Sequence, residues 1–380
     1  MKIGILTLPL HTNYGGILQA YALQTILERM GHEVKVIDKS RYRYIPFWKI
    51  PFAYIYRGVK KFIFGKNVNI RQEKYYNSCL NRDVITQKYT RPFIESHIKL
   101  LHIENFHELK ESDFDALVVG SDQIWRTIYT KLFMQSTTAA FLDFASRWTN
   151  VKRISYAASF GTGDWEYSKR DTRMCKRLIQ RFEAVSVREN DGVKLCEKYL
   201  NYANAIQVLD PTFLLNQEDY KRLLGQNECK HKNSVFCYIL DLNEQKKNLI
   251  QSVEENLQLK SFFVNSRVDD WSAPMQERIQ PPVEDWLQGF VDADFVITDS
   301  FHACVFSIIF KKQFVVIGNE KRGLSRFSSL LAMFGLESRI VLKSENFNVR
   351  NLDDIDYDSV YEKLETYKNK SLTFLKENLL

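Results

Sequence analysis

The chain has 380 residues, of which 45% are apolar and 26% charged, and it carries a formal net charge of +7. This length fits two domains of similar size, and the apolar content excludes a wholly disordered protein. The six cysteines form no CxxC pair and have no zinc-like spacing with histidine, so we expect reduced thiols and no metal site. No run reaches the ~18 apolar residues of a transmembrane helix. Because the first residues also lack a signal-peptide pattern, we expect a cytoplasmic protein.

The first half of the chain alternates short apolar runs with longer amphipathic segments. Ile3–Leu8 is typical of a buried strand, Ile17–Met30 of a helix, and Val34–Ile37 of the next strand. This β-α-β order predicts a parallel sheet with right-handed crossovers. Further strands are expected at Ala116–Val119, Ile154–Ala158, Ala184–Val187 and Ile206–Leu209.

A second alternating series follows Asp210–Leu215, which marks the exit from the first domain. Its expected strands are Val235–Leu240, Phe262–Val264, Phe295–Thr298 and Phe314–Ile317, with helices near Lys246–Leu257, Val283–Val291 and Ala303–Lys311. We therefore predict an α/β protein with two doubly wound Rossmann-like domains facing a cleft, at residues 1–213 and 214–345. A C-terminal helical tail is expected at 346–380. In such sheets ligands bind beyond the carboxyl ends of the strands.

A basic segment rich in aromatic residues, at residues 41–66, interrupts the first domain. From Lys35 to Lys66 the sequence has nine Lys or Arg and one acid, Asp38. Such a segment can bind nucleic acid, lie at an anionic membrane surface, or form a partly buried irregular insertion with a solvated face. Because no nucleic-acid motif accompanies it, we favour peripheral contact with the membrane and expect no nucleic-acid partner. Pro46 and Pro51 are expected to break any long helix.

The first strand-to-helix turn combines polar side chains with paired glycines. It is neither a GxGxxG fingerprint nor a Walker loop. Glycines let the backbone approach a ligand, and a helix N-terminus favours an anion or a polar group. The alternative is a tight turn with a capped helix. Because polar side chains stand beside the glycines, we expect acceptor contacts from His11, Asn13, Gly15 and Gly16.

The turns after the next strands also carry polar groups. Asp122 follows a buried strand and could act as a base or only cap a helix, while Gln123 and Trp125 suit carbohydrate recognition. Arg188 lies just past another strand, where its guanidinium can hold a carboxylate or phosphate in bidentate fashion. The alternative for Arg188 is a salt bridge to Glu189 or Asp191.

The sharpest signal lies where Phe295–Thr298 ends and an apolar helix begins. His302 stands at the start of this helix, close to Asp299 and Ser300. A histidine at a helix N-terminus can act as an acid or base near neutral pH. A loop with three cations, Lys321, Arg322 and Arg326, follows the next strand and is either an anion clamp or a solvated basic loop.

These motifs occur in a fixed order along the chain. They are the Ile-Gly-Ile-Leu-Thr opening with Asn-Tyr-Gly-Gly, then Val-Val-Gly-Ser-Asp-Gln-Ile-Trp, Ser-Val-Arg-Glu, Val-Leu-Asp-Pro-Thr and Thr-Asp-Ser-Phe-His. Together they resemble the polysaccharide pyruvyl transferase family, from about Met1 to about Arg339. The resemblance implies a GT-B-like fold and phosphoenolpyruvate as co-substrate, with no cofactor. It implies as acceptor a sugar or a lipid-linked oligosaccharide of a cell-surface polysaccharide precursor.

The resemblance also assigns roles to residues. His302 matches the catalytic histidine of the family, and Arg188 matches an arginine that holds the donor. Relatives that use phosphoenolpyruvate carry an arginine two residues before the histidine, where this chain has Ser300. On this reading the donor is bound by the second domain and the acceptor by the first, with Asp122 taking a hydroxyl proton. The full set expected at the donor is Arg188, Ser300, Lys321, Arg322 and Arg326.

Two alternatives remain open from the sequence. One is a nucleotide-sugar glycosyltransferase of the GT-B type, in which Glu284 or Asp285 would bind a ribose. The other is a glycan-binding accessory protein without catalysis, which would bind no donor. On the pyruvyl transferase reading, the basic segment 41–66 would hold the enzyme at the inner face of the membrane, near a lipid-linked acceptor.

Overall fold

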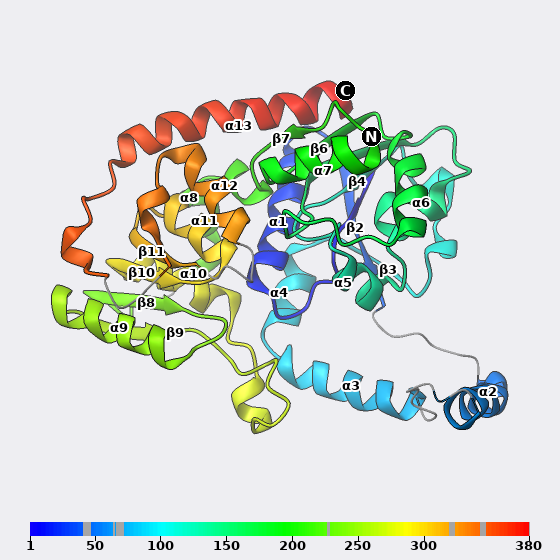
Figure 1. Ribbon diagram of the computed structural model, residues 1–380, viewed down its shortest axis with the longest axis horizontal. Helices are drawn as coiled ribbons and strands as arrows, with labels where there is room; N and C mark the ends of the chain where they lie inside the picture. The colour runs from blue at the N-terminus through cyan, green and yellow to red at the C-terminus, as the bar shows by residue number, and fades with distance from the viewer. Residues whose placement is uncertain are drawn as a thin grey trace.

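A computed structural model describes residues 1–40, 47–63, 65, 72–225, 229–318, 324–342 and 347–379. Its core consists of two parallel sheets with helices packed around them (Figure 1). The predicted loop cations Lys321 and Arg322 lie outside the described residues, as do both ends of the basic segment 41–66.

The first sheet has seven strands in the order β3-β2-β1-β4-β5-β6-β7, and all its pairings are parallel. Parallel neighbours require crossover connections, and the helices between the strands supply them. The strands are β1 (Lys2–Leu6), β2 (Glu33–Lys39), β3 (Leu100–Ile103), β4 (Ala116–Val119), β5 (Lys152–Ala158), β6 (Ala184–Val187) and β7 (Ile206–Gln207). Its crossover helices include α1 (Tyr14–Arg29), α4 (Thr90–His97), α6 (Lys169–Ile179) and α7 (Asn190–Leu200).

The second sheet has five parallel strands in the order β12-β11-β10-β8-β9. They are β8 (Ser234–Tyr238), β9 (Lys260–Phe263), β10 (Phe295–Thr298), β11 (Gln313–Ile317) and β12 (Ile340–Val341). The helices around it are α8 (Gln217–Lys221), α9 (Glu244–Leu257), α10 (Val283–Asp292), α11 (Phe301–Ile309) and α12 (Leu324–Phe334). The predicted fold class, two Rossmann-like α/β units in a GT-B-like arrangement, is confirmed.

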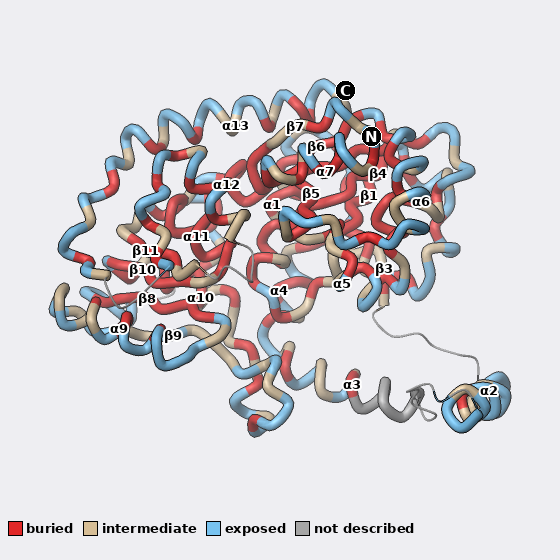
Figure 2. The backbone as a smooth tube through the Cα atoms, in the orientation of Figure 1, coloured by how far each residue is buried: buried red, intermediate tan, exposed pale blue. Residues whose placement is uncertain are grey.

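Both faces of the first sheet are buried, which follows from its alternating side chains. Along β4, Val118 joins one apolar cluster, while Leu117 and Val119 join a second cluster on the opposite face. The first cluster continues into the second unit, where it includes Phe236 of β8 and Trp286 of α10. The two units therefore share one apolar core, which fixes how their strand ends meet (Figure 2).

The C-terminal tail forms one long helix, α13 (Tyr357–Leu379), which lies across both units (Figure 1). The Ser371 hydroxyl accepts a hydrogen bond from the backbone N–H of Leu209 at 3.0 Å, in the first unit. The Tyr361 hydroxyl donates to the carbonyl of Ile309 at 2.6 Å, in the second unit. This helix therefore ties the two units together.

The segment between β2 and β3 differs from the expectation that prolines would break any long helix. It contains α2 (Ile50–Phe62) and α3 (Gln72–Thr86), and Pro51 lies in the first turn of α2. Proline is tolerated there because its missing N–H would have no intrahelical partner. Pro51 therefore begins a helix rather than breaking one. Two short strands, β3 and β12, were not predicted from the sequence, and β7 is shorter than predicted.

Candidate functional site

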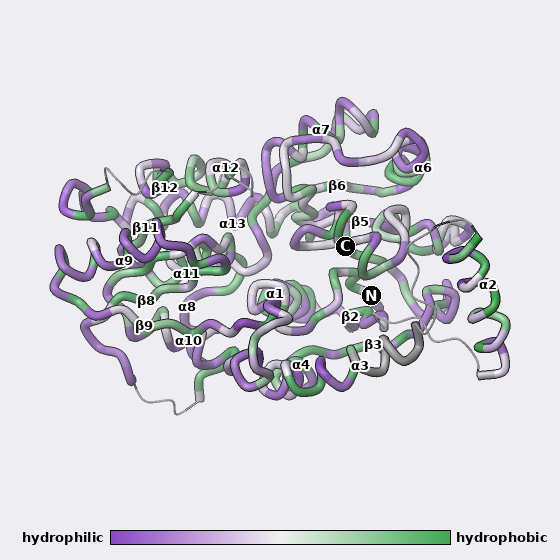
Figure 3. The backbone as a smooth tube through the Cα atoms, turned by 60° about the horizontal axis from the view of Figure 1, so that its bottom comes forward, coloured by the Kyte–Doolittle hydropathy of each residue, from purple (hydrophilic) through white to green (hydrophobic). Residues whose placement is uncertain are grey.

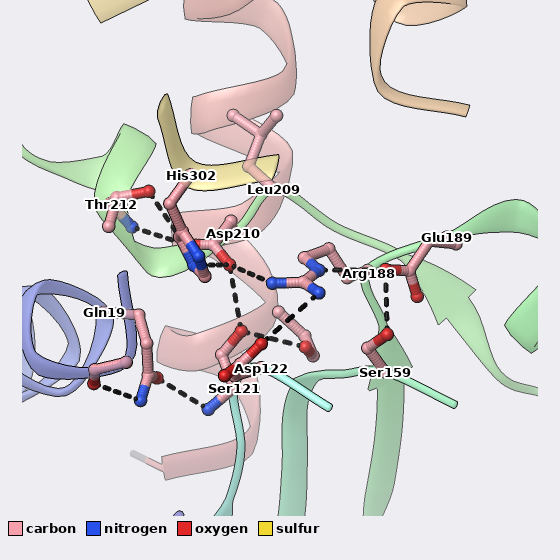
Figure 4. A network of polar contacts seen from close by, with 12 residues as sticks. Gln19, Ser121, Asp122, Ser159, Arg188, Glu189, Leu209, Asp210, Thr212 and His302 are labelled. Carbon is pink, nitrogen blue, oxygen red and sulfur yellow. Dashed lines mark hydrogen bonds and ion pairs between the residues drawn. The ribbon is translucent and has the colours of Figure 1, made fainter. Parts of the chain in front are cut away.

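A polar cluster lies where the carboxyl ends of the first sheet meet the N-terminus of α11 (Figure 4). Asp122 follows β4, Arg188 follows β6, and Asp210 lies shortly after β7. His302 is in the first turn of α11, directly after β10. The cluster therefore combines groups from both units, at the strand ends where α/β sheets bind ligands.

Arg188 is the centre of this cluster, and its side chain is buried. Its Nε donates to Glu189 at 2.9 Å and its Nη1 donates to Asp210 at 2.9 Å. Its Nη2 lies 3.7 Å from an oxygen of Asp122 and has no hydrogen-bond partner among the described residues. The predicted salt bridge to Glu189 therefore exists, and Nη2 is left with an ion pair to Asp122 but no hydrogen bond among the described residues.

Asp210 is the hub that joins Arg188 to His302, and the sequence analysis did not assign it to the site. Besides Arg188, its carboxylate accepts hydrogen bonds from Ser121 Oγ at 3.2 Å and from Thr212 Oγ1 at 2.7 Å. Burial alone would raise the pKa of Asp210. The close contact with His302 and the charge of Arg188 outweigh burial and hold the pKa of this carboxyl well below its usual range. Asp210 is therefore ionised and holds its neighbours electrostatically.

His302 is buried, with its Nε2 at 3.5 Å from a carboxylate oxygen of Asp210. At this distance the pair is an ion pair when the imidazole is protonated, but a poor hydrogen bond. The other ring nitrogen faces α1: a Cβ added to Gly15 would lie 2.0 Å from His302 Nδ1. Gly15 is therefore needed because His302 occupies the space that any side chain there would fill.

Asp299, which the sequence placed beside His302, pairs elsewhere. Its carboxylate accepts a hydrogen bond from Leu240 N at 2.7 Å and binds Lys246 Nζ at 2.6 Å. Ser300 donates its backbone N–H to Thr298 Oγ1 at 3.0 Å and stands at the N-cap position of α11. The carboxylate partner of His302 is thus Asp210, from the other unit.

Arg326, on α12, supplies a second guanidinium close to Arg188. Both cations lie over the ring of Phe301, with Arg188 Cζ 4.0 Å and Arg326 Cζ 5.9 Å from its centroid. Burial, and then the positive charge of Arg188, lower the pKa of Arg326. Its Nε is shielded from solvent and has no hydrogen-bond partner in the described part of the chain. Two neighbouring cations, one of which keeps a shielded N–H group without a partner, favour a bound anion.

The predicted acceptor residues of the first turn serve partly as local structure. Asn13 Oδ1 caps α1 by accepting from Gly16 N at 3.3 Å, which is the capped-helix alternative. His11 Nδ1 lies 3.0 Å from Thr12 Oγ1. Gly15, by contrast, is a direct neighbour of the site through His302.

The prediction that the ring of Trp125 contacts a sugar is wrong. The indole is fully buried, and its Nε1 donates to the carbonyl of Ala140 at 3.0 Å. It stacks on Phe141, with ring centroids 4.8 Å apart. A ring with no exposed face offers no surface for a sugar, so Trp125 packs the core. Gln123 accepts a hydrogen bond from Arg126 at 3.2 Å.

A cavity of about 460 Å³ lies at the carboxyl ends of the strands at the β3 side of the first sheet. Pro9 and Leu10, from the turn between β1 and α1, form part of its wall. Asp38 is a half-buried carboxylate in its lining and pairs with His102 at 2.9 Å and with Arg91 at 3.4 Å. No local sequence pattern indicates this cavity, because its walls come from segments far apart in the chain.

The remaining predicted contacts lie apart from this cluster. Glu284 and Asp285, considered for a ribose, are in the first turn of α10, and Asp285 lies 3.7 Å from Lys230 Nζ. Among the described residues, no three His, Cys, Asp or Glu side chains are grouped to hold a metal ion. Within the same part of the chain, no helix is long and apolar enough to cross a membrane.

Comparison with known protein families defines the family of this chain. The family model for polysaccharide pyruvyl transferase matches residues 13–321. The chain therefore belongs to the polysaccharide pyruvyl transferase family, a family of enzymes. A search of curated proteins finds none that matches the chain.

Solved structures with similar coordinates are distant in sequence. UDP-GlcNAc 2-epimerase from Neisseria meningitidis bound to UDP-GlcNAc is 11% identical, with a TM-score of 0.49 over 100% of this chain and 99% of that one. UGT89C1 from Arabidopsis thaliana complexed with UDP is 11% identical, with a TM-score of 0.49 over 100% and 99%. The Escherichia coli heptosyltransferase WaaC with ADP is 11% identical, with a TM-score of 0.38 over 97% and 100%.

Proposed function

We propose that this protein transfers a pyruvate ketal from phosphoenolpyruvate to a pair of hydroxyls on a sugar of a cell-surface polysaccharide precursor. The observation that carries the donor assignment is the guanidinium pair over Phe301. Neither the Nε of Arg326 nor the Nη2 of Arg188 has a hydrogen-bond partner among the described residues. Phosphate and carboxylate groups are the anions that such planar donors bind best.

We propose that Arg326 takes the role of the arginine that the family resemblance leads one to expect at the position of Ser300. The arginine expected two residues before His302 is replaced here by a guanidinium that comes from the following helix. Arg188 already donates to Glu189 and Asp210, whereas the Nε of Arg326 has no hydrogen-bond partner among the described residues. We infer that Arg326 provides the main contact to the donor anion.

The proposed reaction uses His302 as the acid. The imidazolium, stabilised by Asp210, gives its proton to the C3 methylene of the donor, and positive charge develops at C2. One sugar hydroxyl forms a bond to C2, the C2–O bond to phosphate breaks, and the second hydroxyl closes the ketal. Of the two hydroxyl protons, one restores His302 and the other leaves with phosphate. Asp122, which lies beside Arg188, is the carboxylate that we propose to relay them.

The acceptor is proposed to lie in the cavity that adjoins the β1–α1 turn. Its volume of about 460 Å³ lies in the range of small-molecule sites. Its lining carries acidic groups such as Asp38, Glu104 and Glu108, which suit neutral hydroxyls better than the anionic donor. If it holds the acceptor, Asp38→Asn raises the KM for the sugar several-fold without changing the KM for phosphoenolpyruvate.

The experiment that tests the donor is calorimetric titration of the purified protein with phosphoenolpyruvate and, separately, with a panel of nucleotide sugars. Arg326→Met is the informative variant, since its removal leaves no hydrogen-bonded carboxylate unpaired. It should weaken phosphoenolpyruvate binding about 10- to 100-fold, the loss expected for one charge-assisted contact. Its stability should be close to that of the wild type, because the Nε of Arg326 makes no hydrogen bond within the described part of the chain.

Arg188→Ala is a poorer test, because it would strand three carboxylates and cost about 3–5 kcal/mol of stability. Binding of a nucleotide sugar without phosphoenolpyruvate would support the glycosyltransferase alternative. No binding of either class would support the accessory protein. Equal phosphoenolpyruvate affinity in the wild type and Arg326→Met would contradict the donor site.

A further inference from the structure

The helix α2 has an apolar face that no part of the described protein covers. Phe52, Ile55, Tyr56, Val59 and Phe62 are all exposed, from 38% for Val59 to 78% for Phe62. Their spacing of three, one, three and three residues places them on one stripe, which spans roughly 120° of the helix. Figure 3 shows hydrophobic and hydrophilic stretches alternating along this helix, as expected for an amphipathic segment.

The position of α2 explains why this stripe is open to solvent. Figures 1 and 2 show α2 apart from both sheets, beyond the far end of α3, with most of its surface exposed. A helix that stabilised the fold would turn its apolar side to the core. Here that side faces outwards, as expected for a surface that has another partner.

The charge around this stripe identifies the partner. Residues 40–71 contain no Asp or Glu and eight cations, which are Arg41, Arg43, Lys49, Arg57, Lys60, Lys61, Lys66 and Arg71. Lys60 Nζ lies 4.4 Å from the ring centroid of Tyr56, and Lys49 Nζ lies 4.7 Å from that of Trp48, one turn before α2. Cations beside interfacial aromatic rings are typical of helices that lie in the plane of an anionic bilayer surface.

We propose that α2 is a membrane anchor, which inserts the stripe formed by Phe52, Ile55, Tyr56, Val59 and Phe62 into an anionic lipid surface. The flanking lysines would remain at the level of the lipid headgroups. A second copy of the chain fits the stripe less well, because two segments that carry cations and no acids repel each other. An acidic protein also fits less well, because its charge alone would not cover the apolar stripe. The inference does not depend on pyruvyl transfer, because membrane binding is measured without substrate.

The test is co-sedimentation of the full chain with sucrose-loaded vesicles of phosphatidylcholine alone or with 30% phosphatidylserine (about one anionic lipid in three). We expect binding to the anionic vesicles, weakened by salt. The triple variant Phe52→Ser, Ile55→Ser and Phe62→Ser should lose at least about tenfold in affinity. Lys60→Gln with Lys61→Gln should lose about fivefold for each cation.

The matched control replaces three equally exposed apolar residues elsewhere, Leu132, Leu240 and Leu342, with serine. Its vesicle affinity should equal that of the wild type. Trp48 gives a second readout, because its fluorescence should shift to the blue on binding and the shift should be absent in W48F. Equal binding by the wild type and the stripe variant would overturn the proposal. So would a wild type that does not bind the anionic vesicles. If that protein formed a dimer and the stripe variant did not, the stripe would be a protein interface.

Discussion

Gly15 and Gly16 offer a matched pair of substitutions that tests where His302 stands. Both lie in the first turn of α1, and alanine favours a helix over glycine by up to about 1 kcal/mol. A Cβ on Gly16 would lie 3.5 Å from Asn13 Cγ, which is an ordinary contact. A Cβ on Gly15 would lie 2.0 Å from His302 Nδ1 and 2.7 Å from His302 Cβ.

The two distances at Gly15 set the size of the effect. Normal contacts of about 3.5 Å require the imidazole to move by roughly 1.5 Å. Rotation about χ1 does not move His302 Cβ, so α1 and α11 must also separate by several tenths of an ångström. Overpacking of this kind costs about 1–3 kcal/mol. A 1 Å displacement of a catalytic group lowers turnover about 100-fold.

Gly15→Ala should therefore lose about 100-fold in kcat and 1–3 kcal/mol in stability, while Gly16→Ala keeps both near the wild-type values. Turnover is measured as inorganic phosphate released from phosphoenolpyruvate, with p-nitrophenyl glycosides as acceptors. Stability is measured by urea unfolding of the same preparations. A Gly15→Ala protein with wild-type turnover and stability would refute the placement of His302 against α1.

Two further predictions follow from buried groups. Trp125→Phe should cost about 1–3 kcal/mol of stability, because the carbonyl of Ala140 loses its donor. The KM for the acceptor should not change. A raised acceptor KM with unchanged stability would show that Trp125 contacts the acceptor after all. Asp210 has a depressed pKa in the folded state, so it stabilises the fold above the unfolded value of about 3.9 and loses that contribution as the pH falls. Urea unfolding between pH 7 and pH 3 should show this loss, and a flat profile below pH 5 would contradict the paired carboxylate.

The sequence was sufficient to predict the site residues that directly follow a strand. Arg188 and His302 each follow a short apolar strand, and parallel strands bring their carboxyl ends to one edge. Asp210 was missed because β7 is only two residues long and the Asp-Pro pair looks like an exit turn. Its signal was present in the Val-Leu-Asp-Pro-Thr run, which was used for the resemblance but not for chemistry.

Burial could not be predicted from local pattern at two positions. Trp125 follows polar residues, as an exposed binding residue would, yet a turn after β4 returns it to the core beside Phe141. Pro51 indicates a helix break in isolation, but a proline in the first turn of a helix is compatible with it. Both outcomes depend on contacts with residues from other parts of the chain, and a short stretch of sequence does not show these contacts.

The two arginines of the site differ in how strongly the fold depends on them. Arg188 is surrounded by Asp122, Glu189 and Asp210, so the folded chain needs its charge even without a ligand. Burial and then the like charge of Arg188 lower the pKa of Arg326, and its shielded Nε has no hydrogen-bond partner in the described part of the chain. A charge that burdens the free protein is best explained by a state in which an anion compensates it, because only that state returns the cost of burying it.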